Sequence, residues 1–221
     1  AVPPDPRNIR RFREGTRRRP ELARKKFRFE FRAGMLEFLK IFTEGTADML
    51  KAIPSMMLRG GTSRGLYFRG DDMPTDRDAI GKILLSAMGS YSETQIDGVG
   101  GATPLTSKIA IVSPSKEEGV DVDYLFAQVG FLEPIVDFGP TCGNILSGIA
   151  PFALEQGMVA AAEGTTTVRI RLVNTGALVD AIVQTPGKTV NYEGSAAIDG
   201  VPGTAAPIIL NFVEATGSKT G

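Results

Sequence analysis

After Ala52, hydrophobic and polar positions alternate over short stretches, a pattern that predicts strands with few helices among them. The stretch AIPSMMLRGGTSRGLYF predicts a strand, a glycine-rich turn and a second strand, which together are typical of a hairpin. Asp76 is a suitable N-cap for a helix over RDAIGKILLSAMGS, because the apolar residues of that stretch recur at helical spacing. This part of the chain is therefore expected to form a hairpin followed by a helix.

The pattern that follows is richer in strands. A glycine-rich loop, IDGVGGATPLTS, leads into the strand KIAIV, and the half-buried strand VDVDYLFAQVGF and the short strand IVDF come next. A helix is expected from Gly143 to about Glu155, closed by Gly157. Four later segments predict strands: TTVRIRLVN, LVDAIVQT, KTVNYEG and PIILNFVE. The final residues, EATGSKTG, are typical of a connector, and we expect them to lead into a further segment of chain.

The composition excludes several kinds of active site. The 221 residues include one cysteine and no histidine, which excludes an internal disulfide, a Ser-His-Asp or Cys-His mechanism, and a zinc site built on imidazole. Acid–base chemistry must therefore use Lys, Asp, Glu, Tyr or the one Cys. No apolar run approaches the roughly 20 residues of a membrane span. The sequence thus predicts a soluble protein that does not enter a membrane, and we expect a cytoplasmic location.

The net charge of zero conceals two oppositely charged parts. Residues 1–34 carry 12 Lys or Arg against 4 Asp or Glu, a net of +8, whereas residues 35–221 carry 13 against 21, a net of −8. The basic part could contact nucleic-acid phosphates or serve as a transit peptide, although it contains no Ser and four acidic residues. We favour a third interpretation, in which residues 1–48 are a basic leader outside the fold and residues 49–221 form one domain.

Cys142 is the first candidate for chemistry. It stands at the expected N-terminus of a helix, where unpaired amides and the helix dipole attract anions and make a thiol more reactive. Gly143, Asn144 and Gly148 follow it, and such small residues allow a close approach to the backbone. The alternative interpretation is a small buried side chain at the start of a helix, which is the usual environment of a free cysteine.

Two further features bear on anion binding and proton transfer. RGGTSRG, from Arg59 to Gly65, combines glycines, hydroxyls and arginines that could hold a carboxylate, or it is simply a solvated hairpin turn. Lys108 opens the strand KIAIV, where partial burial could make it a general base, or it is a surface lysine at a strand edge. Neither RGGTSRG nor GVGGATP matches a Walker loop or a dinucleotide fingerprint.

In order and spacing, MLRGGTSRGLYF, MGS, QIDGVGGATPLTSKIAIV, DVDYLFAQV, CGNILSGIAPFALEQGMV and IDGVPGTAAPI closely resemble the methylaconitate isomerase family. Within it, they are most similar to the 4-oxalomesaconate tautomerases of bacterial aromatic-acid degradation. The resemblance covers roughly Met49 to Gly221. It implies an α+β fold like that of diaminopimelate epimerase, in which a curved, mostly antiparallel sheet wraps around a central helix, and of whose two halves this chain holds one.

The resemblance also implies an isomerase that moves a double bond in an unsaturated di- or tricarboxylic acid by a 1,3-proton transfer, with no metal and no organic cofactor. The family's catalytic lysine falls on Lys108, in LTSK, and its active-site cysteine on Cys142, in CGN. The implied substrate-binding residues are Arg59, Thr62, Ser63, Ser107, Gly143 and Asn144. Assembly as a homo-oligomer is compatible with the sequence.

Departures from the family pattern leave rival functions open. Arg64 stands where many relatives have Lys, Thr141 stands where Asn is common, and the second half of the fold lies beyond this sequence. A racemase or epimerase of the same fold would need two cysteines, and this chain has one. A non-catalytic carboxylate-binding or vestigial domain is the other rival. Nucleic-acid binding rests on the basic leader alone, so we expect no nucleic-acid partner.

Overall fold

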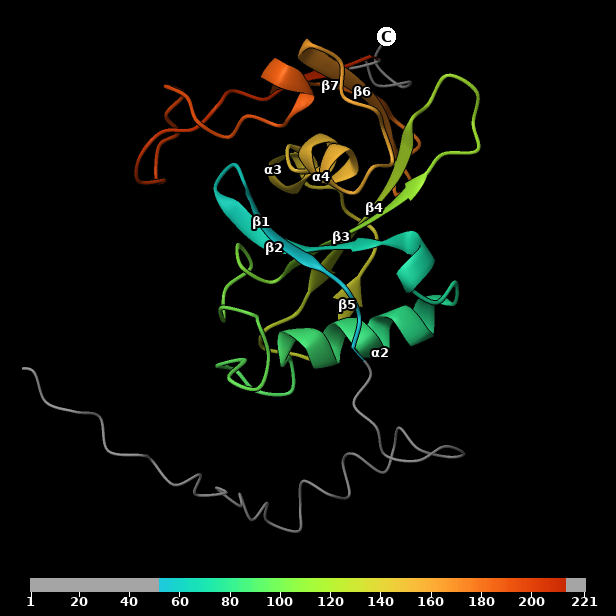
Figure 1. Ribbon diagram of the computed structural model, residues 1–221. Helices are drawn as coiled ribbons and strands as arrows, with labels where there is room; N and C mark the ends of the chain where they lie inside the picture. Colours follow the sequence, from blue (N-terminus) through green and yellow to red (C-terminus); the bar gives the residue numbers. More distant parts are fainter. Residues whose placement is uncertain (1–51, 214–221) are drawn as a thin grey trace, which may run out of the picture. The chain divides into compact units, whose positions relative to one another are not determined.

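The computed structural model describes residues 52–213. The predictions made for residues 1–48 and for the connector EATGSKTG lie outside the described residues. Within the described part, the chain forms one mixed sheet with helices on both of its faces (Figure 1). The helices are α2 (Arg77–Met88), α3 (Gly143–Leu146) and α4 (Ile149–Glu155), with short 3-10 turns at Gly70–Asp72 and Pro186–Lys188.

The sheet has the spatial order β1-β2-β3-β4-β6-β7-β8, and β5 pairs with one end of β4. Among the described residues, β2/β3 and β4/β6 are parallel pairs and the other five are antiparallel. The predicted mostly antiparallel sheet is thus confirmed. The strands are β1 (Met56–Gly60), β2 (Ser63–Arg69), β3 (Lys108–Pro114), β4 (Val122–Val129), β5 (Val136–Asp137), β6 (Gly164–Leu172), β7 (Leu178–Thr185) and β8 (Ile209–Phe212).

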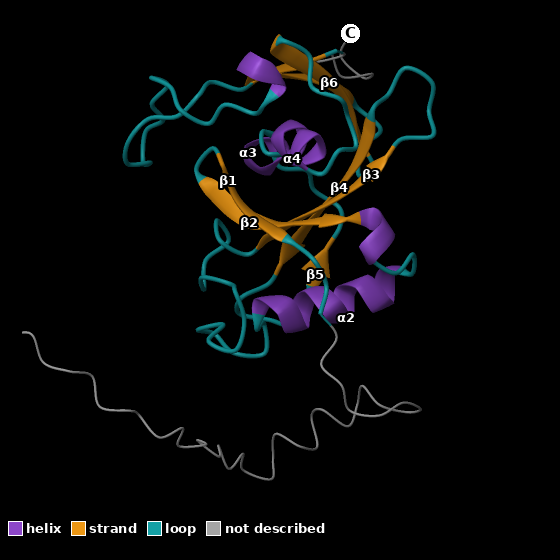
Figure 2. Cartoon of the chain, viewed as in Figure 1, coloured by secondary structure: helices purple, strands orange, loops and turns teal. Residues whose placement is uncertain are grey.

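The sheet curls around α3 and α4, and its two faces carry separate hydrophobic clusters (Figures 1 and 2). We call the cluster on the concave face the inner core. It joins α3 and α4 to alternate residues of β2, β3, β4, β6 and β7, among them Tyr67, Ala110, Tyr124, Phe126 and Ile170. The opposite face of β2 to β4 packs on α2. Because side chains alternate between faces, every second residue of β3 and β4 faces the inner core.

Local signals in the sequence account for the first elements. β1 and β2 pair as an antiparallel hairpin that ends at the Gly60–Ser63 pair, as predicted. Asp76 caps α2, its Oδ2 accepting a 2.8 Å hydrogen bond from the amide of Ala79. Gly89 ends α2 in the left-handed conformation with φ 69°, which glycine adopts without strain. The predicted hairpin and capped helix are therefore confirmed.

The single helix predicted from Gly143 to about Glu155 is wrong, because the chain breaks it into α3 and α4 at Ser147 and Gly148. Pro151 supplies the physical reason: it has no amide hydrogen to donate to the carbonyl of Ser147, four residues earlier. The Tyr67 hydroxyl occupies the break and donates a 2.7 Å hydrogen bond to the carbonyl of Ile145. A side chain at Gly148 would collide with that hydroxyl.

The strand predicted over KTVNYEG is also wrong, since residues 189–194 form a loop after the 3-10 turn at Pro186–Lys188. Asn191 is the cause we identify. Its Nδ2 donates to the carbonyl of Glu193 at 2.9 Å, and its Oδ1 accepts from the amide of Glu193 at 3.0 Å. These bonds satisfy the backbone groups of Glu193 locally, while the Asn191 amide donates to the carbonyl of Gln184 on β7 at 2.9 Å and the Tyr192 carbonyl accepts from the Ala206 amide.

An ion pair supports the short parallel contact between β4 and β6. Arg171 and Asp123 are direct partners in that register, and the guanidinium donates to both carboxylate oxygens. The hydrogen bond from Arg171 lowers the pKa of Asp123 below its ordinary value. The contact joins only three residue pairs, so this cross-strand pair helps to fix its register.

Two buried tyrosines of the inner core should respond differently to loss of the hydroxyl. Tyr67 donates to Ile145, whereas among the described residues the Tyr124 hydroxyl is buried without a hydrogen-bond partner. Burial raises the pKa of both, and the Cys142 thiol adds to the rise. Tyr67→Phe is therefore expected to lower the free energy of unfolding by about 1–3 kcal/mol, and Tyr124→Phe to leave it unchanged or raise it. Urea titrations of the two variants test this, and equal losses would show that Tyr124 has a partner.

Candidate active site

Lys108 begins β3 and faces the inner core. Its Nζ donates a 2.9 Å hydrogen bond to Oε1 of Gln128 and lies 5.3 Å from the centre of the Phe126 ring. The side chain is half-buried. Alternation along β3 places it on the same face as Ala110, a member of the inner core. The predicted base thus stands at the edge of the concave face, with its amine held by a neutral acceptor.

The loop before Lys108 is organised by a buried glutamine that the sequence pattern did not reveal. Gln95 is 1% exposed and has φ 49°, and its Oε1 accepts 2.8 Å hydrogen bonds from the Ala102 amide and the Ser107 hydroxyl. Its Nε2 donates to Ser90 at 3.0 Å. Ser107, predicted to bind substrate, is fully buried, and its hydroxyl holds the loop. A contact between Ser107 and substrate stays a prediction.

Cys142 is the N-cap residue of α3, with φ −138° and ψ 109°. It is a free, half-buried thiol that packs against the inner core, the cluster that Lys108 also borders. Its carbonyl accepts the first hydrogen bond of the helix, from the Leu146 amide at 2.9 Å. The amides of Gly143 and Asn144 have no acceptor within the helix, as is general for a first turn. The thiol therefore stands beside these two amides, and their binding of a substrate carboxylate stays a prediction.

Asn144 joins this helix end to the hairpin turn of β1 and β2. Its Nδ2 donates to the Thr62 hydroxyl at 2.9 Å and to the Ser63 hydroxyl at 3.3 Å. Gly60 and Gly61 make the close approach possible, because a side chain on either would collide with Asn144. The motifs RGGTS and CGN, about 80 residues apart in sequence, thus form one structural unit.

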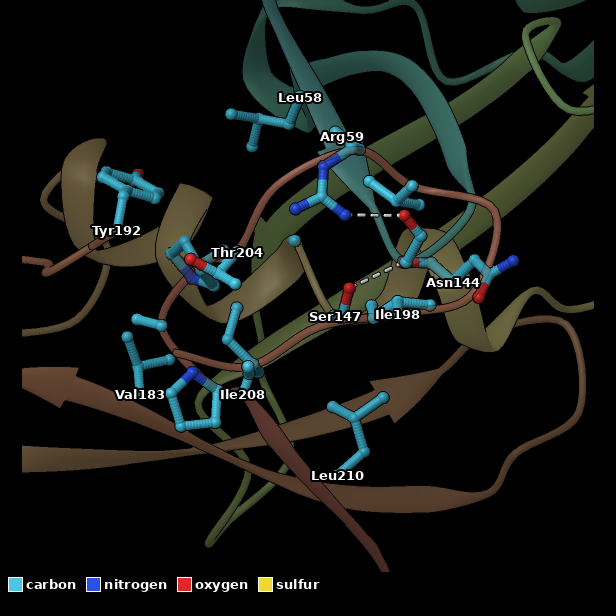
Figure 3. A pocket seen from close by; sticks show the side chains of 18 of the residues that line it. Leu58, Arg59, Asn144, Ser147, Val183, Tyr192, Ile198, Thr204, Ile208 and Leu210 are labelled. Atoms are coloured by element: carbon cyan, nitrogen blue, oxygen red, sulfur yellow. Dashed lines mark hydrogen bonds between the residues drawn. The ribbon is translucent and has the colours of Figure 1, made fainter. Parts of the chain in front are cut away.

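Arg59 lies on β1, next to this turn. Its side chain is exposed, and Nη1 donates to the carbonyl of Gly61 at 2.8 Å, so the guanidinium lies over the turn (Figure 3). Among the described residues, neither Arg59 nor Lys108 forms an ion pair with a carboxylate. The site therefore contains two basic side chains that no described carboxylate pairs with, an arrangement that is compatible with binding of an acidic ligand.

A cavity of about 390 Å³ lies beside the helix end, with Arg59 and Asn144 in its wall (Figure 3). Residues of the motif IDGVPGTAAPI and of the preceding loop form much of the remaining wall: Val190, Asn191, Tyr192, Ala196, Ile198, Val201, Gly203, Thr204, Ala205, Ala206, Pro207 and Ile208. Neither Lys108 nor Cys142 is among the described residues that line it. The cavity thus reaches the helix end next to Cys142 through Gly143 and Asn144, whereas Lys108 lies outside its described lining.

In the part from 52 to 213, no group of three or more acidic, Cys or His side chains is arranged to hold a metal ion. Across that same range, no helix is long and apolar enough to cross a membrane.

Comparison with known proteins assigns the chain to one family. The family model described as "PrpF protein" matches residues 50–221. Over 172 residues the chain is 55% identical to YbhH of Escherichia coli (strain K12) and 52% identical to the "(4E)-oxalomesaconate Delta-isomerase" of Novosphingobium sp. (strain KA1). Each match covers 78% of this chain but only 49% and 48% of the relative, so the chain spans about half the length of these relatives.

A solved structure supports the same fold. The chain resembles the crystal structure of methylitaconate-delta-isomerase with a TM-score of 0.69 and 44% sequence identity, over 72% of this chain and 41% of that one. The fold class predicted from the sequence is confirmed by this likeness and by the curled sheet described above.

Proposed function

Because the chain belongs to the PrpF protein family, we propose that it forms half of the active site of an isomerase. The reaction would move a double bond in an unsaturated di- or tricarboxylic acid by a 1,3-proton transfer, without a metal or an organic cofactor. The observation that carries the proposal is that Asn144 joins the Cys142 helix end to Thr62 and Ser63. Lys108 borders the inner core against which Cys142 packs. An acidic substrate held there would be bound between the proposed base and the thiol.

The first step of this mechanism is substrate binding. The amides of Gly143 and Asn144 would receive one carboxylate, and Arg59 would attract a second. Thr62 and Ser63 position the Asn144 side chain, so they act on the substrate through it or contact it directly. A carbon acid beside a carbonyl becomes more acidic when such groups stabilise the charge that develops on the substrate oxygens.

Lys108 would then carry out the proton transfer as the general base. Its neutral amine takes a proton from the allylic carbon, the electron pair of the broken C–H bond enters the conjugated system, and the double bond shifts. The proton returns to the carbon two positions away, so the product is an isomer and nothing is oxidised or reduced. Cys142 would act as an acid or polarise the substrate from beside the bound carboxylate. The proposal places the protein in the cytoplasm, where a catalytic thiol stays reduced.

Deuterium exchange tests this function. The protein is prepared at the full length that its gene encodes and mixed in D₂O with unsaturated tricarboxylic acids such as oxalomesaconate and methylaconitate. Proton NMR is expected to show the double bond in a new position and deuterium at one allylic carbon. Unchanged spectra with every unsaturated di- and tricarboxylate tried would contradict the proposal.

A carboxylate-binding domain without turnover is the second candidate. It is favoured by the two basic side chains of the site, Arg59 and Lys108, which form no ion pair with a described carboxylate. This alternative expects the same acids to shift the amide signals of Gly143 and Asn144 without any deuterium uptake. An epimerase would instead exchange a proton at one stereocentre and leave the double bond in place.

A further inference from the structure

Gln128 faces Lys108 directly across two antiparallel strands. The two residues are partners in the β3/β4 register, so their side chains leave the same face of the sheet. The contact is a 2.9 Å hydrogen bond from Nζ of Lys108 to Oε1 of Gln128. Below it lies the Phe126 ring, two residues back along β4. The amine of the proposed base thus has one polar partner and one aromatic partner, and both belong to β4.

The orientation of the Gln128 amide is determined by its surroundings. Nε2 lies near three carbonyl oxygens, 3.0 Å from that of Ser107 and 3.3 Å from those of Pro104 and Val129. Rotating the amide by 180° would turn its oxygen toward these three acceptors and its NH₂ group toward a lysine that can only donate when charged. The amide oxygen must therefore face Lys108.

We propose that Gln128 is a positioning residue for Lys108, an inference that rests on the function proposed above. It holds the amine by accepting one N–H, and it ties down the loop before the lysine through the carbonyls of Pro104 and Ser107. A neutral amine keeps its lone pair for the substrate proton while one N–H is bound in this way. Gln128 on β4 thus positions the amine of Lys108 and leaves the lone pair of Nζ free to accept the substrate proton.

The choice of an amide has a chemical reason. A carboxylate at this position would form an ion pair with Lys108 and favour the charged amine, which cannot accept a proton. The amide oxygen accepts the same hydrogen bond with no full negative charge. The strands on either side of this pair each carry a charged residue close to it in the register. On β5, Asp137 pairs with Gln128, but it is exposed and accepts a 2.8 Å hydrogen bond from the Gly139 amide. On β2, Arg64 precedes Gly65, the residue that pairs with Lys108.

Kinetics of Gln128→Met in the full-length protein test the role. The substitution keeps the length of the side chain but removes both the acceptor and the donor. We expect kcat to fall about 10- to 100-fold, the effect of a slightly misplaced catalytic group, while KM stays unchanged. Gln184→Met is the matched control, because Gln184 is a half-buried glutamine on β7 and should tolerate the change. Unchanged kcat in Gln128→Met, or a change confined to KM, would overturn the proposal.

A second measurement is independent of turnover and of the proposed function. Carbon-13 relaxation of lysine Cε groups reports how far each side chain is held. In the unaltered protein, Lys108 is expected to be more ordered than the exposed Lys82 and Lys116, and Gln128→Met should remove that difference. If Lys108 is as mobile as the other two from the outset, the positioning role is wrong even where isomerisation is observed. If Lys108 is ordered but no acid is isomerised, the hydrogen bond stands and the proposed function fails.

Discussion

Lys108→Met is expected to abolish isomerisation in the full-length protein and to stop deuterium from entering the allylic carbon. A general base typically contributes about 100- to 10,000-fold, so the loss would be unmistakable in proton NMR spectra recorded in D₂O. The substituted side chain retains similar length and can still pack against the Phe126 ring that the lysine amine overlies. Groups assigned to the substrate carboxylates in the proposal lie on other elements, on β1, in the β1–β2 turn and at the start of α3. Binding of the acid is therefore expected to survive, and calorimetry would measure it.

The control for this variant is Lys116→Met. Lys116 is an exposed residue in the loop between β3 and β4, and its substitution also removes a lysine amine but does not touch the inner core. Both variants should unfold at similar temperatures. Near-normal deuterium exchange in Lys108→Met would show that another residue is the base, and the assignment of Lys108 as the catalytic base would then be wrong.

Much of the fold was predictable because its signals are local. Asp76 and Gly89 mark the ends of α2, and the glycine-rich turn between two apolar runs marks the hairpin. The break between α3 and α4 could also have been read from Pro151, whose missing amide hydrogen leaves the Ser147 carbonyl without a helical donor. The false strand over KTVNYEG had a different origin. Its alternation is real, but Asn191 turns the chain locally, and Val190 and Tyr192 line the cavity instead of a sheet face.

The candidate site was predictable only in part, because its residues meet through long-range packing. The motifs that contain Lys108 and Cys142 predict a role for both residues, which stays a prediction, but no sequence pattern shows how the helix end meets the hairpin turn. That contact depends on Asn144 reaching Thr62 over glycines that have no side chain. Gln128 was missed for a related reason. Alternation shows that it shares a face with Phe126, but only the register of β3 against β4 places it opposite Lys108.

Substitution of Cys142 is the second change that we expect to lower activity strongly. The thiol is half-buried at the first turn of α3 and borders the same inner core as Lys108, so in the proposed complex it would lie beside the bound carboxylate. If it is the acid that returns or guides the proton, Cys142→Ala should lower kcat by about 100-fold or more, the lower range for an acid–base group. Cys142→Ser keeps a weak acid in the same place and should retain more of the exchange reaction than Cys142→Ala.

Alkylation provides a check on Cys142 that needs no turnover. As the single cysteine of this chain, placed beside unpaired amides, the thiol is expected to react with iodoacetamide faster than an ordinary thiol near neutral pH. A bound polycarboxylate would cover the amides of Gly143 and Asn144 and should slow the reaction, whereas a monocarboxylate such as acetate should protect far less. Mass spectrometry of the modified chain measures both rates. Slow alkylation that no acid alters would mean that Cys142 is only a packing residue, and the loss of activity in Cys142→Ala would then have to come from a disturbed α3.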